Sequence, residues 1–214
     1  MKFIFFLKTL IRILYYLQSN EKRYLNLLIQ ILKKRPQKIL EVGVYNGRRA
    51  KQMIEAAKVF NNDIEYYGFD LFEELTKKIH KIEASKFPSS FDSIKRLLNN
   101  HAKIFLYKGF TNETLKEFSL KKVNIDFIFV DGGHSVKTIE SDLYYSLKIA
   151  DKDAYIIFDD FYETGTIDIT KFGSNKIYEK LKLSKNQPIF LPFSDAYTNG
   201  NEKKVIKMFM IQKK

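Results

Sequence analysis

The sequence predicts an α/β protein with a doubly wound, Rossmann-like sheet. The sheet is expected to be mostly parallel, to finish in an antiparallel strand pair and to be preceded by N-terminal helices. From residue 38 onward, short apolar runs alternate with amphipathic segments of roughly a dozen residues, as in βαβ units. The runs are apolar nearly throughout, which is typical of strands covered on both faces. With 214 residues, the chain is long enough for one such domain.

The first 17 residues predict a basic amphipathic helix. Lys2, Lys8 and Arg12 fall in one sector of a helical wheel and leave a wide apolar arc. Lys8 and Arg12 divide the apolar sequence into runs far shorter than the ~20 residues that cross a bilayer, and no secretory cleavage site follows. Three interpretations stay open: packing against the chain's own core or a second subunit of a homo-oligomer, peripheral attachment to an anionic membrane, and binding of an acidic partner.

A second helix is predicted to begin at an Asn20 cap and to end before Pro36. Residues 1–38 carry nine cations and one anion, and therefore eight of the twelve net positive charges. We expect residues 1–37 to form basic N-terminal helices outside the domain of residues 38–214. The charge therefore bears on where the protein sits, which we expect to be the cytoplasm or the inner face of a membrane.

The remaining elements follow in order. The parallel strands are predicted at residues 38–44, 65–70, 103–107, 125–131 and 154–159. Helices are predicted at residues 48–60, within 73–100, and at 112–118, 135–150 and 174–183. A long loop is expected at residues 84–92. Residues 189–193 and 205–212 flank Asn199-Gly200, which predicts the closing hairpin.

The residues after the first two strands predict a nucleoside site, because ligands of doubly wound sheets lie beyond the carboxyl ends of the strands. Gly43 and Gly47 follow Glu41 and allow a tight turn close to a ligand. The turn lacks the dinucleotide pattern G-x-G-x-x-G. Asp70 ends the second strand 23 residues beyond Gly47, near the ~20-residue offset of a ribose-binding acid. After the third strand, Gly109 and Phe110 are candidates for an adenine pocket, with Phe110 in the core as the alternative.

The fourth and fifth strands end in carboxylates at Asp131 and at Asp159 and Asp160. If these strands are neighbours, the carboxylates repel one another, so we expect a divalent cation, or a Lys or Arg partner, among them. The chain has no cysteine, which excludes thiolate metal sites and favours Mg²⁺ or another oxygen-binding cation. His134 follows the fourth strand and is a candidate general base.

Together these segments resemble class I S-adenosylmethionine-dependent methyltransferases, most closely the macrocin O-methyltransferase-like and related small-molecule branch. The resemblance covers about residues 38–213. It depends on Glu41-Val-Gly-Val-Tyr-Asn-Gly47, Tyr67-Gly-Phe-Asp70, Lys108-Gly-Phe-Thr-Asn-Glu-Thr-Leu115, Val130-Asp-Gly-Gly-His-Ser135 and Phe158-Asp-Asp160.

The resemblance implies a role for each candidate residue. Glu41, Gly43 and Gly47 correspond to contacts with the methionine end of S-adenosylmethionine. Asp70 corresponds to a ribose contact, and Gly109 with Phe110 to the adenine neighbourhood. In metal-dependent members, Asp131, Asp159 and Asp160 correspond to the metal ligands. Members of the branch often read Asp-Gly-Asp where this chain has Asp131, Gly132 and Gly133. His134 is therefore the better candidate base, with Asp131 as the second catalytic candidate.

The function predicted from the resemblance is metal-assisted O-methylation of a hydroxylated small molecule, such as a sugar or glycan precursor. A catalytically silent methyltransferase-like binding or tethering module is one alternative, and a nicotinamide-dependent oxidoreductase is another. A nucleic-acid substrate is not expected, because no base-flipping signature is visible and the basic residues lie outside the predicted site.

Overall fold

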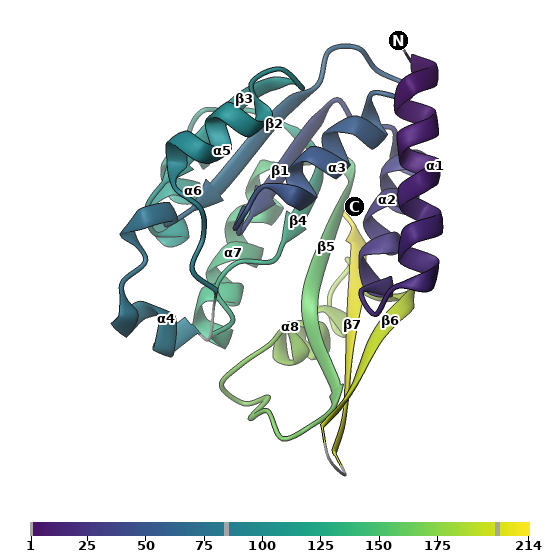
Figure 1. Ribbon diagram of the computed structural model, residues 1–214. Helices are drawn as coiled ribbons and strands as arrows, with labels where there is room; N and C mark the ends of the chain where they lie inside the picture. Colours follow the sequence, from purple (N-terminus) through teal and green to yellow (C-terminus); the bar gives the residue numbers. More distant parts are fainter. Residues whose placement is uncertain (1, 84–85, 200–201) are drawn as a thin grey trace.

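The computed structural model describes residues 2–83, 86–199 and 202–214, which form a seven-stranded sheet between two layers of helices (Figure 1). The strand order is β3-β2-β1-β4-β5-β7-β6. The first five strands are mutually parallel: β1 (Lys38–Val42), β2 (Glu65–Asp70), β3 (Lys103–Lys108), β4 (Ile125–Val130) and β5 (Ala150–Thr164). β7 (Glu202–Gln212) runs antiparallel to both β5 and β6 (Ile189–Asn199). The predicted fold class is confirmed.

The sheet separates two hydrophobic cores because successive strand residues point to opposite faces. Ile39 of β1 packs in one core and Leu40 in the other. The first core is covered by α1 (Lys2–Gln18), α2 (Leu25–Lys34), α3 (Arg48–Ala57) and α5 (Phe91–Leu98). The second is covered by α6 (Thr111–Ser119), α7 (Val136–Ile149) and α8 (Asn175–Lys182).

The predicted helical region 73–100 contains more than one element. A 3₁₀ turn, η2 (Phe72–Glu74), is followed by the short helix α4 (Lys77–Glu83) and then by α5. The Ser90 hydroxyl caps α5 by accepting a hydrogen bond from the backbone N–H of Ser93. Within the hairpin signal Asn199-Gly200, Gly200 lies outside the described residues.

The prediction that Asn20 caps the second helix is wrong. A 3₁₀ turn, η1 (Lys22–Tyr24), leads into α2, whose cap position is Tyr24 without a side-chain hydrogen bond. The backbone N–H of Arg23 donates instead to Asp195 Oδ1 in β6, at 2.8 Å. A carboxylate 172 residues away therefore satisfies a donor at the start of the turn.

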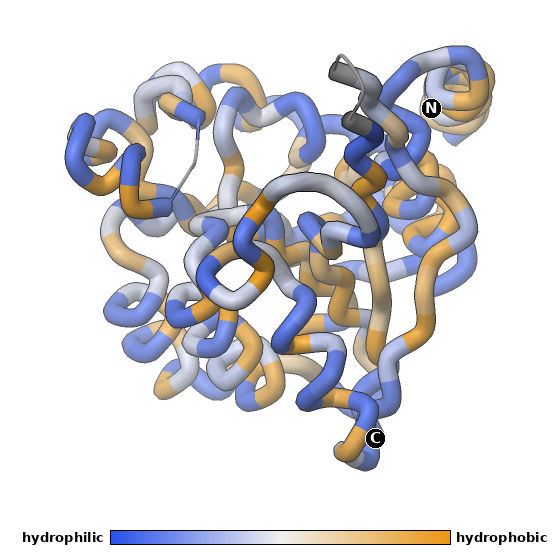
Figure 2. Tube along the Cα trace, turned by 90° about the horizontal axis from the view of Figure 1, so that it is seen from below, coloured by the Kyte–Doolittle hydropathy of each residue, from blue (hydrophilic) through white to orange (hydrophobic). Residues whose placement is uncertain are grey.

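The first helix, α1, packs on α2 and α3 at the edge of the molecule (Figures 1 and 2). Its inward side combines core contacts of Tyr16 and Ile13 with polar ones: Thr9 is buried, the Tyr16 hydroxyl donates to Gln52 at 2.7 Å, and Lys8 and Arg12 pair with the buried Glu55. Ile13 and Tyr16 reach the chain's own core, whereas most of the apolar arc faces outward. The interpretation that the arc packs against the chain's own core is therefore confirmed only for a small part of it. Within the described parts of the chain, no helix has the length and hydropathy needed to cross a membrane.

Candidate active site

The loop between β1 and α3 passes very close to the end of β4. Gly43 has a φ of 88°, and a Cβ atom at this position would lie 2.0 Å from the carbonyl oxygen of Asp131. Only glycine fits such an approach. Gly47, with a φ of 72°, occupies the cap position of α3. The glycine pattern predicted from the sequence therefore brings the first and fourth strand ends together.

Asp70 joins three of the predicted cofactor-binding segments. Its carboxylate accepts hydrogen bonds from the backbone N–H groups of Tyr45, at 2.8 Å, and Phe72, at 3.0 Å. Its carbonyl oxygen accepts from the N–H of Gly109, at 3.0 Å. Burial raises the pKa of Asp70, and these backbone N–H donors act in the opposite direction. The first three strand ends thus meet around one carboxylate.

Two predicted cofactor residues have contrasting surroundings. Phe110, at the cap of α6, is 46% exposed, so the alternative that it is a core residue is wrong. Glu41 is buried within β1 and accepts a hydrogen bond from the Tyr66 hydroxyl. Burial raises the pKa of Glu41 to about 8. Its contact with a ligand stays a prediction.

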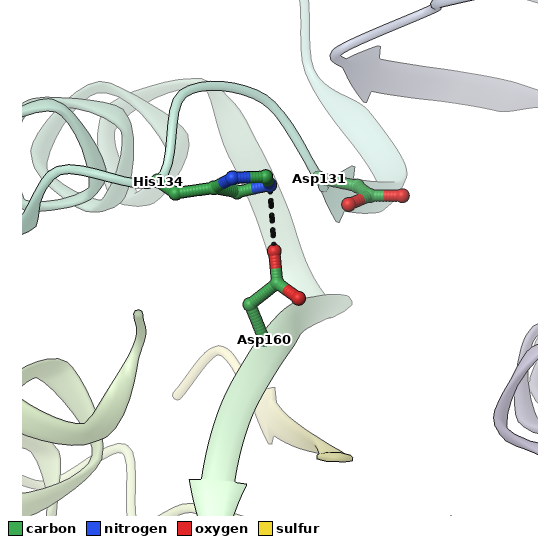
Figure 3. A group of neighbouring side chains, drawn as sticks. All are labelled: Asp131, His134 and Asp160. Carbon is green, nitrogen blue, oxygen red and sulfur yellow. Dashed lines mark ion pairs between the residues drawn. The ribbon is translucent and has the colours of Figure 1, made fainter. Parts of the chain in front are cut away.

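Asp131, His134 and Asp160 gather where β4 and β5 lie side by side (Figure 3). One potential ligand atom from each residue lies within 4.8 Å of the others. His134 Nε2 is 2.8 Å from Asp160 Oδ2. A cavity of about 10 Å³, lined in part by these residues, is close to the size that holds one water molecule.

The environments of the two clustered carboxylates differ. Burial and the neighbouring Asp159 and Asp160 raise the pKa of Asp131 well above its usual value. Burial acts in the same direction on Asp160, but the charges of His134 and Arg23 outweigh it and lower the pKa to about 2. Asp160 also has a φ of 57°, at a point where the pairing of β5 with β7 shifts register. Such backbone strain is common where a fold aims a side chain at a functional site.

Asp159 lines the same cavity but is not one of the three grouped residues, and its carboxylate is paired with Arg23. Arg23 Nε lies 2.8 Å from Asp159 Oδ1 and 3.1 Å from Oδ2. The guanidinium also donates to Asp195 and to the Tyr24 hydroxyl, and the side chain is almost fully buried. The basic residues were predicted to lie outside the site, and for Arg23 this prediction is wrong. The expected cationic partner of the carboxylates is an arginine, and the role of Asp159 as a metal ligand stays a prediction.

Glu83, at the end of α4, is a second residue that sequence analysis missed. Its carbonyl oxygen accepts from the N–H of His134 at 3.1 Å, and its carboxylate accepts from the N–H of Ser135 at 3.0 Å. A Cβ atom on Gly133 would lie 2.5 Å from Glu83 Oε2. A carboxylate from α4 therefore occupies the space beside Gly133 and holds the loop that carries His134.

The sheet order, its single antiparallel strand β7 and the glycine turn beside Asp70 define the fold of class I S-adenosylmethionine-dependent methyltransferases. A family model described as a methyltransferase domain matches residues 40–161, more than half of the chain. The chain therefore belongs to this family of methyltransferases, and the nicotinamide-dependent alternative is excluded.

Solved structures share the fold at low sequence identity. The O-methyltransferase TomG of Streptomyces achromogenes, in complex with S-adenosylmethionine, is 13% identical, with a TM-score of 0.62 over 88% of this chain and 78% of that chain. An O-methyltransferase of Bacillus cereus, in complex with S-adenosylhomocysteine, is 15% identical, with a TM-score of 0.62 over 87% and 79%. Cofactor-bound Rv0187 from MTB is 11% identical, with a TM-score of 0.62 over 97% and 91%. No curated protein sequence matches the chain.

Proposed function

We propose that the protein transfers the methyl group of S-adenosylmethionine to a hydroxyl group of a small molecule, such as a sugar or glycan precursor, in the cytoplasm. The observation that carries this proposal is the cluster of Asp131, His134 and Asp160, which lies where the pairing of β4 with β5 ends, next to the loops joined by Asp70. This arrangement combines a nucleoside site with groups able to accept a proton. O-Methyltransferases among the structures of like fold support the choice of a hydroxyl acceptor.

The cofactor half of the proposed site is formed by the first three strand ends. Gly43 and Gly47 carry no side chain at two positions of the β1–α3 loop, so the methionine end of the cofactor can approach the backbone there. Two backbone N–H groups hold the Asp70 carboxylate, whose remaining lone pairs are available to accept ribose hydroxyls. Glu41 at the first strand, and Gly109 with Phe110 after the third, complete the proposed contacts.

The donor set of the cluster fits a divalent cation. Two carboxylates and one imidazole offer atoms within 4.8 Å of one another, beside a cavity of single-water size. We assign the carboxylates of Asp131 and Asp160 as the groups that would hold the cation, with Asp159 as a further predicted ligand, and we assign His134 as the base rather than as a ligand. When bound, a divalent cation such as Mg²⁺ supplies positive charge that lowers the pKa of a coordinated hydroxyl.

His134 is the proposed general base. Its contact with Asp160 stabilises the protonated imidazole, which favours transfer of the acceptor's hydroxyl proton to the ring. The hydroxyl oxygen then bonds to the methyl carbon while the carbon–sulfur bond of the sulfonium breaks. The products are a methyl ether and S-adenosylhomocysteine. Glu83 positions the ring by holding the backbone of residues 134 and 135.

Two measurements test this function. Isothermal titration is expected to show binding of S-adenosylmethionine, and a folded protein that does not bind it would refute the proposal. A screen of soluble and lipid-linked sugars with methyl-labelled cofactor, with and without chelator, identifies the acceptor and the metal requirement.

The pairing of Asp159 with Arg23 favours one second candidate, a cofactor-binding module without metal chemistry. Chelator-sensitive transfer to any acceptor excludes that candidate.

A further inference from the structure

The outward side of α1 is an unusually large exposed apolar surface. Nine large apolar side chains of this 17-residue helix are 41–74% exposed, and we call them the α1 apolar face: Phe3, Ile4, Phe6, Leu7, Leu10, Ile11, Leu14, Tyr15 and Leu17. Elsewhere in the described residues, large exposed apolar side chains are scattered over many elements. A contiguous apolar patch is typical of an interaction site, whereas single exposed residues are ordinary.

The inward contacts of α1 fix this orientation. Thr9 and Tyr16 are buried on the opposite side of the helix, and Arg12 and Lys8 pair with Glu55, which is fully buried on α3. A rotation of α1 that buried its apolar residues would take Lys8 and Arg12 away from the Glu55 carboxylate and leave it only His101, whose Nδ1 lies 3.5 Å away. Breaking a buried ion pair in that way is strongly unfavourable. The α1 apolar face is therefore held outward by electrostatics.

Cations stand beside the α1 apolar face. The Arg48 guanidinium lies 5.6 Å from the ring centre of Tyr15, which belongs to the face. The ammonium groups of Lys8 and Lys58 lie 5.8 and 5.2 Å from the ring centre of Phe5, a half-buried α1 residue outside the face. The side chains of Lys8 and Arg48 are 47% and 44% exposed. The α1 sequence contains no acidic residue. An apolar arc with cations beside it is the pattern of a helix that lies in a membrane interface.

We propose that the α1 apolar face docks on the surface of an anionic phospholipid membrane. The apolar side chains enter the boundary between headgroups and acyl chains, and Arg48 of α3 and Lys58 at its end approach the phosphate level. Charge complementarity selects this occupant over a second copy of the chain. A symmetric pairing through α1 would bring these cations of two copies together, and like-charge contacts oppose association.

Co-sedimentation of the full chain with vesicles tests the proposal. We expect binding to vesicles of equal parts phosphatidylglycerol and phosphatidylcholine, and much weaker binding to phosphatidylcholine alone. Leu7→Ser combined with Ile11→Ser removes apolar area that is exposed in the free protein, so binding falls roughly tenfold or more while the fold persists. Leu120→Ser with Leu183→Ser is the matched control, because these residues are 77% and 93% exposed away from α1. Lys58→Gln weakens binding about fivefold.

Three results would overturn the proposal. The first is no binding to anionic vesicles by protein with a native circular dichroism spectrum. The second is equal loss of binding in the α1 variant and in the matched control. The third is a dimer in light scattering that Leu7→Ser with Ile11→Ser converts to monomer, which assigns the face to a second copy.

Discussion

Asp70 and Asp159 both stand near the carboxyl end of a strand, yet the fold accommodates their charges by different means. Asp70, in the half of the site built by β1, β2 and β3, is held by backbone N–H groups of neighbouring loops. Asp159, in the half built by β4 and β5, is held by the guanidinium of Arg23. Backbone N–H groups of neighbouring loops are enough to stabilise the carboxylate in the first half of the site. In the second half, the carboxylate depends on a side chain from a segment distant in the sequence.

The two halves of the site also differ in the kind of ligand group that they suit. The Asp70 carboxylate, held by backbone N–H groups, remains a hydrogen-bond acceptor beside the glycine loop. Such an acceptor suits the hydroxyl donors of a nucleoside. The second half concentrates Asp131, His134 and Asp160 around a very small cavity, which suits proton transfer and a small cation. Substitutions in each half should therefore affect different steps, and that difference is measurable.

The largest expected effect is on catalysis. His134→Gln removes the proposed base and is expected to lower kcat by about 10²–10⁴-fold. The affinity for S-adenosylmethionine should stay unchanged, because His134 belongs to the half built by β4 and β5. Initial rates with labelled cofactor, together with titration of the cofactor, measure both. Full activity of the variant would show that another group accepts the proton.

The second prediction concerns Arg23, which pairs with both Asp159 and Asp195. Arg23→Met leaves two buried carboxylates without their cation, so the free energy of unfolding should fall by about 3–5 kcal/mol. Urea denaturation measures this change. Arg48→Met is the matched control, since Arg48 is partly exposed and its pairing with Glu21 is long, at 3.5 Å, so its loss should change stability by about 0–1 kcal/mol. Equal effects of the two substitutions would contradict the role given to Arg23.

The third prediction tests the half built by β1, β2 and β3. Asp70→Asn keeps the size of the side chain but removes its charge, and the affinity for S-adenosylmethionine should fall about 10–100-fold. Saturating cofactor should restore most of kcat, because the catalytic half is intact. Titration calorimetry and rates at high cofactor concentration distinguish this outcome from a loss of fold. A variant with normal affinity would remove Asp70 from the cofactor site.

The smallest expected effect concerns a carboxylate outside both halves. Asp142 of α7 is fully buried, and burial raises its pKa to about 7, so the folded protein keeps this proton where the unfolded chain has lost it. The contribution of Asp142 to stability therefore falls as pH rises from about 4 through 7, by about 1 kcal/mol between pH 6 and 8. Asp142→Asn should remove this part of the pH dependence in urea denaturation. An unchanged pH dependence of stability in Asp142→Asn would contradict the raised pKa of Asp142.

The parts of the site that could be predicted share a local signal. Gly43, Gly47 and Asp70 follow or end apolar strands at fixed offsets. Asp131 follows β4, and Asp160 lies in β5 just beyond the last residue that pairs with β4. Strand ends of a parallel sheet meet at one edge, so their residues can be grouped from the sequence. Arg23 and Glu83 had no such signal. Arg23 lies in a basic segment before the first strand, and Glu83 lies 52 residues before Ser135, its hydrogen-bond partner.

The sequence by itself determined the alternation of strands and helices, the glycine turn, the acid that ends the second strand and the set of carboxylates, because each follows from local hydrophobic periodicity and short spacings. Only the tertiary structure decided which carboxylate pairs with Arg23, which group lies beside Gly133 and which side of α1 faces outward. The sequence of α1 predicted an apolar face and a basic face but not which of the two faces the protein. That direction is set by Glu55, whose buried charge draws Lys8 and Arg12 inward from more than 40 residues away.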